Sequence, residues 1–324
     1  MPNVLGIGNA LVDVVTLLDS DQVLERFALP RGSMQLVDGS KSKEISEGTS
    51  HLKREIASGG SAANTIYGLA RMGVESGFIG KTGRDEMGRL FKQDLENYGV
   101  KTYLLESDTP SGVAMALISP DSERTFATYL GAAVEMGPDD LDHNLFSRYK
   151  YLHIEGYLVQ NHDLIEAACI AGKKAGMTLS IDMAAYNVVE ANLDFLKHLV
   201  AKYIDIVFAN EEEAKVFTGA MPEEALESIA SMCSLAVVKI GREGSLIARG
   251  KERVKSGVIR VNSIDTTGAG DLYASGFLAG LLKGLPLEKC GYMGSVLAGK
   301  TIEVMGPRMP QEKWNEVFEL TSGL

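Results

Sequence analysis

The segment Asp265-Thr266-Thr267-Gly268-Ala269-Gly270-Asp271, followed by Leu272-Tyr273-Ala274-Ser275-Gly276-Phe277, organises this chain. Before it, residues 258–261 are apolar and β-branched except for Arg260, and apolar residues after it recur at helical spacing. We therefore predict a strand, a tight glycine turn and a helix. The backbone N–H groups of Gly268, Ala269 and Gly270 would lie at the helix N-terminus, where unpaired donors and the helix dipole attract an anion.

Asp271 is an unexpected residue at an anion site, because its carboxylate repels a bound anion. It becomes useful if it removes a proton from a hydroxyl that attacks phosphorus. The alternative interpretation is an ordinary helix N-terminus with an acidic residue in its first turn. The segment alone leaves both interpretations open.

Composition narrows the class of protein. The chain has 324 residues, 45% of them apolar, which is enough for a large core. Its net charge of −11 argues against nucleic acid or an anionic membrane as partner. Cys169, Cys233 and Cys290 lack metal or redox spacing. No signal peptide or membrane-spanning run is evident, so we expect a cytoplasmic protein that binds small molecules.

The order of predicted elements indicates an α/β fold. From residue 151 onward strands and helices alternate, which predicts a doubly wound, mostly parallel sheet with helices on both faces. Residues 4–15 predict one strand interrupted by glycines. Residues 14–57 contain short β-like pieces and no long helix, so we predict a small β-rich lid there, with part of 100–132 as a further contribution. Residues 1–13 and 58–324 would form the large α/β domain.

Two glycine motifs suggest nucleotide sites but lack the required context. Gly294–Thr301 matches the phosphate-binding loop pattern, yet it lies inside a predicted helix, so we expect close helix packing instead. Gly6-Ile7-Gly8 approaches a dinucleotide fingerprint, but Leu11 replaces the third glycine.

Several other segments carry candidate polar groups. Gly59–Asn64 is a second glycine turn that opens a helix, and the Asn64 amide could hold hydroxyls. Asp13 lies near the end of the first predicted strand. Asn210 and Glu213 follow another strand, where Glu213 could orient waters on Mg²⁺ or the pair could simply cap a helix. Gly241–Gly244 is either a ligand-binding turn or a plain hairpin.

Together these features resemble the ribokinase family of small-molecule kinases, also called the phosphofructokinase-B family. The match covers essentially the whole chain, and its two signature regions fall on residues 59–73 and 265–277. The resemblance implies that Asp271 is the catalytic base and that the N–H groups of Gly268, Ala269 and Gly270 form the anion hole. It implies an acceptor clamp made of Asn9, Asp13, Gly60, Ser61 and Asn64.

The resemblance also implies ATP and Mg²⁺ as cofactors. Asn210 and Glu213 correspond to the Mg²⁺-associated pair, which acts through water. The expected ATP-binding residues are Arg124, Asn210, Glu213, Lys239, Gly241 and Gly244. Asp265 and Thr267 fall where some family members bind a monovalent cation, so K⁺ is a further expectation. A catalytically silent nucleotide-binding protein on the same fold is the alternative class.

The acceptor is less closely defined. The long segment between Asp13 and Gly59 is similar to the lid of the adenosine-kinase branch, which favours a purine nucleoside such as adenosine. Glu155 is similar to a sugar-holding residue of ribokinases, which favours free ribose, fructose or a related sugar; the other interpretation of Glu155 is an exposed strand end. Phe27, Leu29, Met34 and Leu36 either cover a base or form a small lid core. We expect a monomer or a lid-mediated homodimer.

Overall fold

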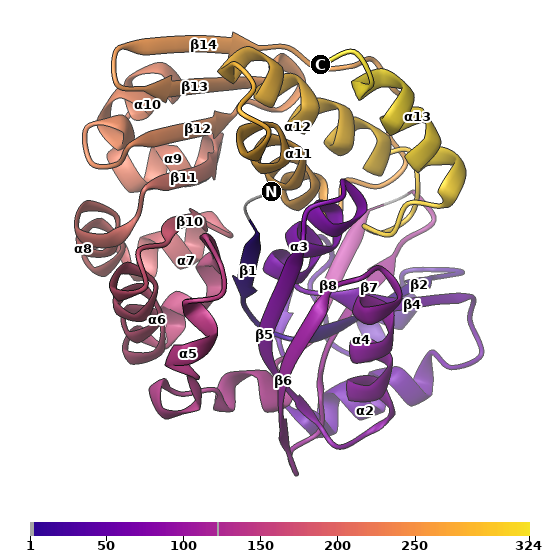
Figure 1. The fold of residues 1–324 in the computed structure, drawn as a ribbon. Coiled ribbons are helices and arrows are strands. Elements are labelled where there is room, and N and C mark those ends of the chain that lie inside the picture. Colours follow the sequence, from indigo (N-terminus) through magenta and orange to yellow (C-terminus); the bar gives the residue numbers. More distant parts are fainter. Residues whose placement is uncertain (1–2, 122) are drawn as a thin grey trace.

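Two β-sheets organise the chain in the computed structural model, which describes residues 3–121 and 123–324 (Figure 1). Within these residues the larger sheet has nine strands in the order β14-β13-β12-β11-β10-β9-β1-β5-β6. The strands from β6 to β12 are parallel, and β12, β13 and β14 form an antiparallel edge. Their bounds are β1 Val4–Ile7, β5 Ser76–Gly83, β6 Lys101–Ser107, β9 Tyr151–Glu155, β10 Thr178–Asp182, β11 Ile206–Asn210, β12 Leu235–Lys239, β13 Ser245–Arg249 and β14 Glu252–Ser256.

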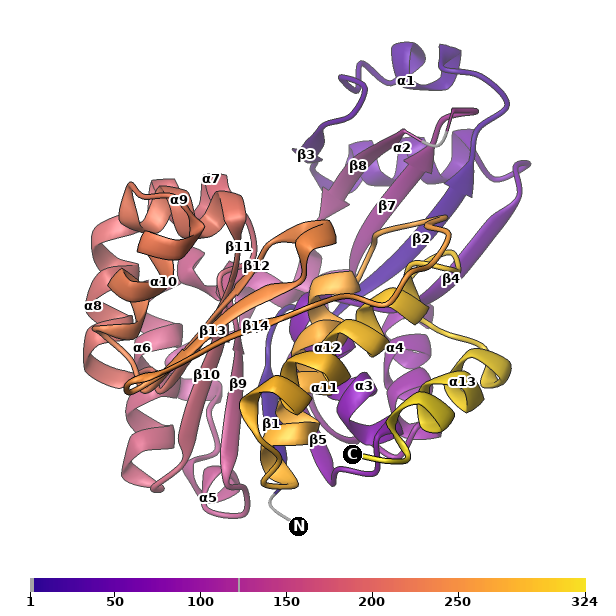
Figure 2. The same cartoon turned by 90° about the horizontal axis from the view of Figure 1, so that it is seen from above.

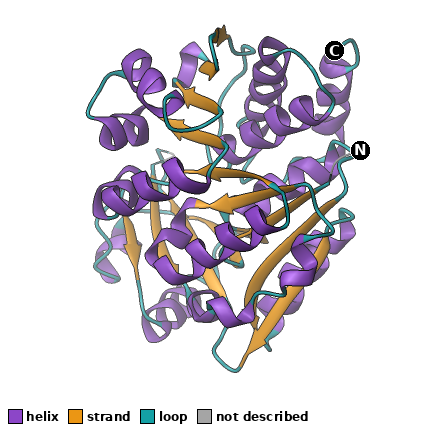
Figure 3. Ribbon diagram, turned by 60° about the vertical axis from the view of Figure 1, so that its left-hand side comes forward, coloured by secondary structure: helices purple, strands orange, loops and turns teal. Residues whose placement is uncertain are grey.

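Helices cover both faces of this sheet, as Figures 2 and 3 show, and this confirms the predicted doubly wound fold. Alternate strand residues enter two separate apolar clusters: Phe208 of β11 packs with one and Val207 with the other. One face carries α3 Ser61–Arg71, α4 Glu86–Asn97, α11 Ala269–Leu282, α12 Leu287–Thr301 and α13 Gln311–Thr321. The other carries α5 His143–Phe146, α6 His162–Lys174, α7 Tyr186–Ala191, α8 Leu193–Tyr203, α9 Glu211–Thr218 and α10 Pro222–Ala230.

The second sheet projects from the first, at the upper right of Figure 2. Its strand order is β3-β8-β7-β2-β4, and α1 Gln22–Arg26 and α2 Gly39–Gly48 belong to the same unit, which we call the lid. The predicted boundary between residues 13 and 14 falls inside β2, while β6 pairs in the large sheet. The strands are β2 Leu11–Leu17, β3 Met34–Leu36, β4 Arg54–Gly59, β7 Gly112–Ile118 and β8 Arg124–Tyr129.

Two strand predictions need correction. Residues 4–15 form two strands, β1 and β2, which belong to different sheets. Residues 258–261 form no strand, because β14 ends at Ser256 and the chain leaves the sheet. Ile259 instead packs beside Gly299 of α12. β-branched composition alone therefore misled the prediction, since a strand also needs a neighbour with which to pair.

The phosphate-binding-loop look-alike lies in α12, as expected from its context. A Cβ on Gly294 would come 2.9 Å from the backbone oxygen of Tyr273 in α11, so the small residue permits close helix packing. Lys300 forms ion pairs with Glu303 and Glu316 at 3.1 and 2.6 Å.

In the part of the chain that the structure describes, none of the helices combines the length and apolarity needed to span a membrane. Short 3₁₀ helices cover Gly131–Glu135 (η1), Pro138–Asp140 (η2), Gly156–Gln160 (η3) and Gly241–Glu243 (η4).

Candidate active site

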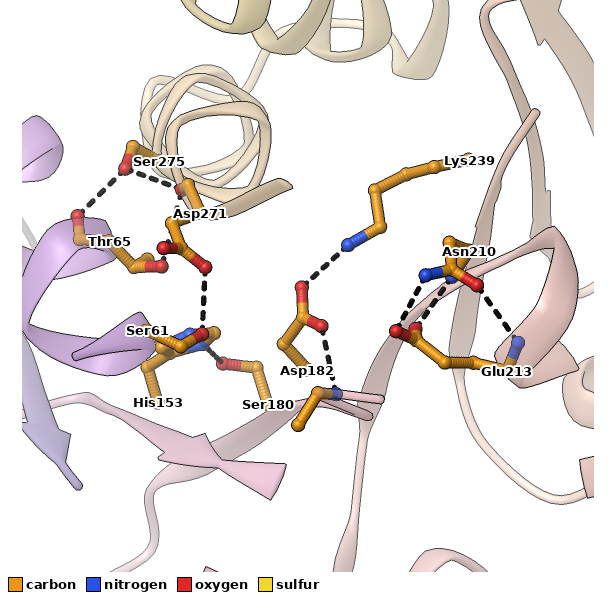
Figure 4. A network of polar contacts seen from close by, with 11 residues as sticks. Ser61, Thr65, His153, Ser180, Asp182, Asn210, Glu213, Lys239, Asp271 and Ser275 are labelled. Carbon is orange, nitrogen blue, oxygen red and sulfur yellow. Dashed lines mark hydrogen bonds and ion pairs between the residues drawn. The ribbon is translucent and has the colours of Figure 1, made fainter. Parts of the chain in front are cut away.

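Polar side chains from distant parts of the sequence meet where the carboxyl ends of the parallel strands face the N-termini of α3 and α11 (Figure 4). This edge is where parallel α/β sheets bind their ligands. The candidate site consists of the α11 N-terminus, the side chains that hold Asp271, and the strand-end residues opposite them.

The N-terminus of α11 lacks a side-chain cap. Gly268 is the N-cap residue with φ of +74°, a left-handed conformation that other residues adopt at a cost. The N–H of Ala269 donates to the backbone carbonyl oxygen of Thr266 at 3.2 Å, so this predicted anion-hole donor is already engaged. Among the described residues no partner is recorded for the N–H groups of Gly268 and Gly270. The predicted anion site therefore rests on these two donors.

Asp271 is held from the side of α3. Its two carboxylate oxygens accept hydrogen bonds from Ser61 Oγ at 2.7 Å and Asn64 Nδ2 at 2.9 Å. Ser61 and Asn64, which were predicted to hold the acceptor, thus fix Asp271. Burial raises the pKa of Asp271 to about 6, against the opposing effect of the Asn64 hydrogen bond. A carboxylate with this pKa is ionised at neutral pH and remains basic enough to accept a proton.

Lys239 faces the uncapped turn from the opposite side. Its ammonium pairs with Asp182 Oδ2 at 2.7 Å, and their side chains are 16% and 5% exposed. A Cβ built on Gly270 would lie 3.1 Å from Lys239 Nζ, which places the charge beside the first turn of α11. Asp182 escaped the sequence analysis, although its place at the end of a buried strand was a usable signal.

Arg124 connects the lid to the segment before α11. Its Nη1 donates to Asp265 Oδ1 at 2.5 Å and to Thr267 Oγ1 at 2.7 Å. Asp265 also accepts the N–H groups of Thr267 and Gly306 at 2.9 and 2.8 Å. A guanidinium therefore occupies the two oxygens predicted to bind a monovalent cation, and K⁺ would have to displace it. Cation binding stays a prediction.

Asn210 and Glu213 form a capping box at the start of α9. Glu213 accepts the Asn210 N–H at 2.8 Å and Nδ2 at 2.7 Å, and Asn210 Oδ1 accepts the Glu213 N–H at 2.9 Å. Glu213 is 2% exposed, and burial raises its pKa to about 7. The helix-cap interpretation describes this geometry, since both carboxylate oxygens are already engaged.

The turn at Gly241–Gly244 joins an antiparallel hairpin. Lys239 in β12 pairs with Ser245 in β13, and both glycines have positive φ. A Cβ on Gly244 would come 1.9 Å from the Ser256 oxygen, so the hairpin itself explains that glycine. Contact of this turn with a nucleotide stays a prediction.

Glu155 is a buried residue, which corrects the exposed strand end considered for it. Its oxygens accept Asn9 Nδ2 at 2.7 Å and the Ala62 N–H at 3.2 Å, and burial raises its pKa to about 7. Gly60 lies beside this contact with φ of +86°, and a Cβ on it would come 2.4 Å from the backbone oxygen of Asn9. Asn9 and Glu155 thus join β1, β9 and the start of α3.

Asp13 is the predicted clamp residue whose carboxylate stays available. It is half-buried in β2, and no hydrogen bond to its side chain is recorded among the described residues. Burial raises its pKa to about 7, while the nearby Arg308 guanidinium lowers it and Asp271 raises it. Asp13 can therefore accept hydroxyl hydrogens from a ligand.

The four apolar residues predicted for the lid lie on two different faces of its sheet. Leu36 pairs with Thr128, Thr128 with Ala114 and Ala114 with Asp13, so Leu36 and Asp13 share one face. Leu36 and Met34 are 57% and 41% exposed. Phe27 and Leu29 are buried with Val12, Val14 and Ile45, on the other side of β2. Phe27 and Leu29 therefore form the lid core and cannot cover the purine base of a bound nucleoside, whereas Met34 and Leu36 remain candidates for that contact.

A cavity of about 530 Å³ begins at Asn9 and extends toward the N-terminus of α6. Its wall includes the half-buried ring of Tyr157 together with Val134 and Met136.

Within the residues that the structure describes, no group of three or more His, Cys, Asp or Glu side chains is placed to hold a metal ion.

Comparison with known proteins identifies related chains. Residues 40–314 match the family described as pfkB family carbohydrate kinase. The crystal structure of adenosine kinase from Sinorhizobium meliloti is 34% identical, with a TM-score of 0.88 over 98% of this chain and 99% of that one. An adenosine kinase of Saccharomyces cerevisiae is 29% identical over 95% of this chain and 96% of its own length. A protein of Archaeoglobus fulgidus described as an uncharacterized sugar kinase is 30% identical over 74% of this chain and 96% of its own length.

Proposed function

The chain belongs to the pfkB family of carbohydrate kinases, and we propose that it transfers the γ-phosphoryl group of ATP to a primary hydroxyl of a purine nucleoside such as adenosine. One observation carries this proposal: Asp271 is held by Ser61 and Asn64 beside the uncapped α11 N-terminus, with Lys239 across from it. A base, two N–H donors with no recorded partner and a cation therefore lie together at the start of α11. A silent nucleotide-binding protein would gain nothing from the Asp271 carboxylate.

The proposed chemistry assigns one task to each group. Asp271 takes the proton from the acceptor hydroxyl as the hydroxyl oxygen attacks the γ-phosphorus of ATP; the bond from that phosphorus to the bridging oxygen breaks, and ADP leaves. The free N–H groups of Gly268 and Gly270 stabilise charge on the phosphoryl oxygens. Lys239 supplies a positive charge on the same turn, and Asp13 aligns the acceptor through its other hydroxyls.

The capping geometry of Asn210 and Glu213 does not fit direct coordination of Mg²⁺. Both Glu213 oxygens accept hydrogen bonds from Asn210, and the carboxyl group is buried. We propose that Mg²⁺ enters with the ATP phosphates and meets this pair through water at most. In the segment before α11, the guanidinium of Arg124 supplies the positive charge that faces the Asp265 carboxylate.

Two features favour a nucleoside over a free sugar. Leu36 and Asp13 share one lid face, roughly three strand spacings of about 4.8 Å apart, so an apolar contact lies beyond a bound ribose. The cavity beside Asn9 adds room next to the Tyr157 ring. Free ribose, fructose or a related sugar is the second candidate, favoured by the buried Glu155 carboxyl group close to the predicted clamp.

A comparison of acceptors tests the proposal. We expect ADP release with adenosine to exceed release with ribose or fructose. Leu36→Ser should lower kcat/KM for adenosine by about 10- to 200-fold and leave that for ribose nearly unchanged. Leu29→Ser is the matched control, because Leu29 lies in the lid core and should lower stability without selecting between acceptors. A wild-type preference for a free sugar of about tenfold or more would contradict the nucleoside assignment.

A further inference from the structure

Arg308 lies between α12 and α13, far along the chain from the residues that it contacts. Its Nη1 donates to Asn64 Oδ1 at 3.0 Å, and its Nε donates to Asp94 Oδ2 at 3.1 Å. It also donates to Ser58 Oγ, and its Cζ lies 4.2 Å from the centre of the Tyr67 ring. The side chain is 11% exposed. A carboxylate and an aromatic face therefore hold the guanidinium plane in one orientation.

This contact determines which way the Asn64 amide points. A guanidinium has only donors, so the Asn64 atom that faces Arg308 must be the oxygen. The amide nitrogen must then lie on the other side, where it donates to Asp271 Oδ2 at 2.9 Å. A flipped amide would place its oxygen against the Asp271 carboxylate and its NH₂ against a cation. Asn64 thus transmits the orientation of Arg308 to Asp271.

We propose that Arg308 is a positioning residue for phosphoryl transfer: it orients the Asn64 amide so that Asn64 donates to the base Asp271. The proposal rests on the proposed function for the role of Asp271. The contacts themselves connect the segment after α12, the helix α3 and the start of α11. Among the described residues, no hydrogen bond joins Arg308 directly to Asp271; the recorded route between them runs through Asn64.

Several other polar and charged groups around Asp271 also influence its pKa. Ser61 and Asn64 face it from α3, and both hydrogen bonds lower its pKa. Loss of the Asn64 donor should therefore raise the pKa of Asp271 and move the acidic limb of the rate profile to higher pH. The remaining groups that act on Asp271, or on which it acts, are Asp13 of β2, Glu155 of β9, Tyr157 of η3, Asp182 of β10, Glu213 of α9 and Lys239 of β12.

The first experiment compares two arginines that both lie on aromatic rings. Arg308→Met should lower kcat/KM by about 10- to 100-fold, the effect of one charge-assisted hydrogen bond, and move the acidic limb upward. Arg71→Met is the matched control, because Arg71 lies 4.8 Å from the Trp314 ring centre and donates to Gln311 at 2.7 Å. It should leave the pH profile unchanged. Equal effects of both variants would overturn the proposal.

A charge-preserving variant separates orientation from electrostatics. Arg308 also lowers the pKa of Asp13, so its charge alone could affect the rate. Arg308→Lys keeps that charge but cannot span Asn64 and Asp94 with one planar group. We expect Arg308→Lys to retain most of the loss seen in Arg308→Met. Wild-type behaviour of Arg308→Lys would show that only the charge matters and would overturn the proposal.

A double-mutant cycle tests the route through Asn64. If Arg308 acts through that amide, Asn64→Ala combined with Arg308→Met should lose no more activity than Asn64→Ala alone. Additive losses would contradict the proposal. A ¹³C NMR titration of the Asp271 carboxyl group, assigned with Asp271→Asn, requires no turnover and keeps this test separate from the proposed function. The titration should move to higher pH in Arg308→Met, and an unmoved titration would overturn the proposal.

Discussion

Helices α9 and α11 both begin at the edge of the large sheet that holds the candidate site, and both carry acidic residues in the first turn. At α9, Asn210 and Glu213 satisfy each other's donors and acceptors. At α11, Gly268 provides no side chain, and Asp271 is held by residues of another helix. The difference teaches that an acidic helix N-terminus marks a site when its donors stay free and its carboxylate is oriented from outside.

The largest expected effect lies at α11. Asp271→Asn should lower kcat by about 10²- to 10⁴-fold, because the base is lost while Ser61 can still hydrogen-bond the side chain. The fold and the dissociation constant for ATP should be preserved. Steady-state kinetics, equilibrium ATP binding and thermal unfolding on the same preparation check this. The proposal is falsified if turnover stays within a few-fold of the wild type.

The same carboxylate predicts a pH dependence of the rate. Burial raises the pKa of Asp271 to about 6, so the base is protonated and inactive below that pH. We expect kcat/KM to fall as pH drops through about 6 and to level off above it. A profile from pH 5 to pH 8 measures this limb. If Asp271→Asn retained the same limb in its residual activity, another group would be responsible.

Stability should show the opposite trend with pH. Burial raises the folded-state pKa values of Asp13, Glu155 and Glu213 to about 7, from 3.8 for aspartate and 4.5 for glutamate. The folded protein then binds more protons than the unfolded chain between these values, so stability falls as pH rises toward 7. Melting temperatures at pH 5 and pH 8 test the sign. Asp13→Asn should reduce the difference, and a melting temperature that rises over this range would contradict the expectation.

The capped helix should respond through stability. Asn210→Ala removes the acceptor for the Glu213 N–H and should cost about 0.5–2 kcal/mol of unfolding free energy. If Asn210 acts only as a cap, the Mg²⁺ concentration for half-maximal rate should change by about twofold or less. Denaturant unfolding and a Mg²⁺ titration on one variant decide this. A large rise in the Mg²⁺ requirement with unchanged stability would instead assign α9 to the metal.

The smallest effect on activity is expected at α12, where a glycine–lysine sequence closes a helix instead of opening one. Lys300→Ala should leave kcat and the ATP affinity unchanged, since Lys300 pairs with Glu303 and Glu316. Loss of these pairs should cost about 1 kcal/mol or less. An ATP affinity reduced by about 100-fold in a folded variant would relocate the phosphate site.

Local pattern predicted much of the fold, and it named the carboxylate that lies at the centre of the candidate site. The helix predicted after the glycine turn of residues 268–270 corresponds to α11, and the helices predicted from residue 151 onward include α6, because apolar spacing and glycine ends are local signals. Asp271 stood out because a carboxylate beside an anion turn is chemically unusual. The strand predicted at 258–261 was wrong because no neighbouring strand pairs with it.

The sequence by itself determined the alternation of strands and helices, the glycine turn before α11 and the identity of its carboxylate. Only the tertiary structure decided what orients that carboxylate. Arg308 and Asn64 are 244 positions apart, and Lys239 meets Asp182 across 57. Residue type and spacing carry no record of such contacts, since they depend on how sheets and helices pack. The lid separates Leu36 from Phe27 in the same way: strand register places Leu36 on the sheet face of Asp13, and packing places Phe27, at the end of α1, in the lid core.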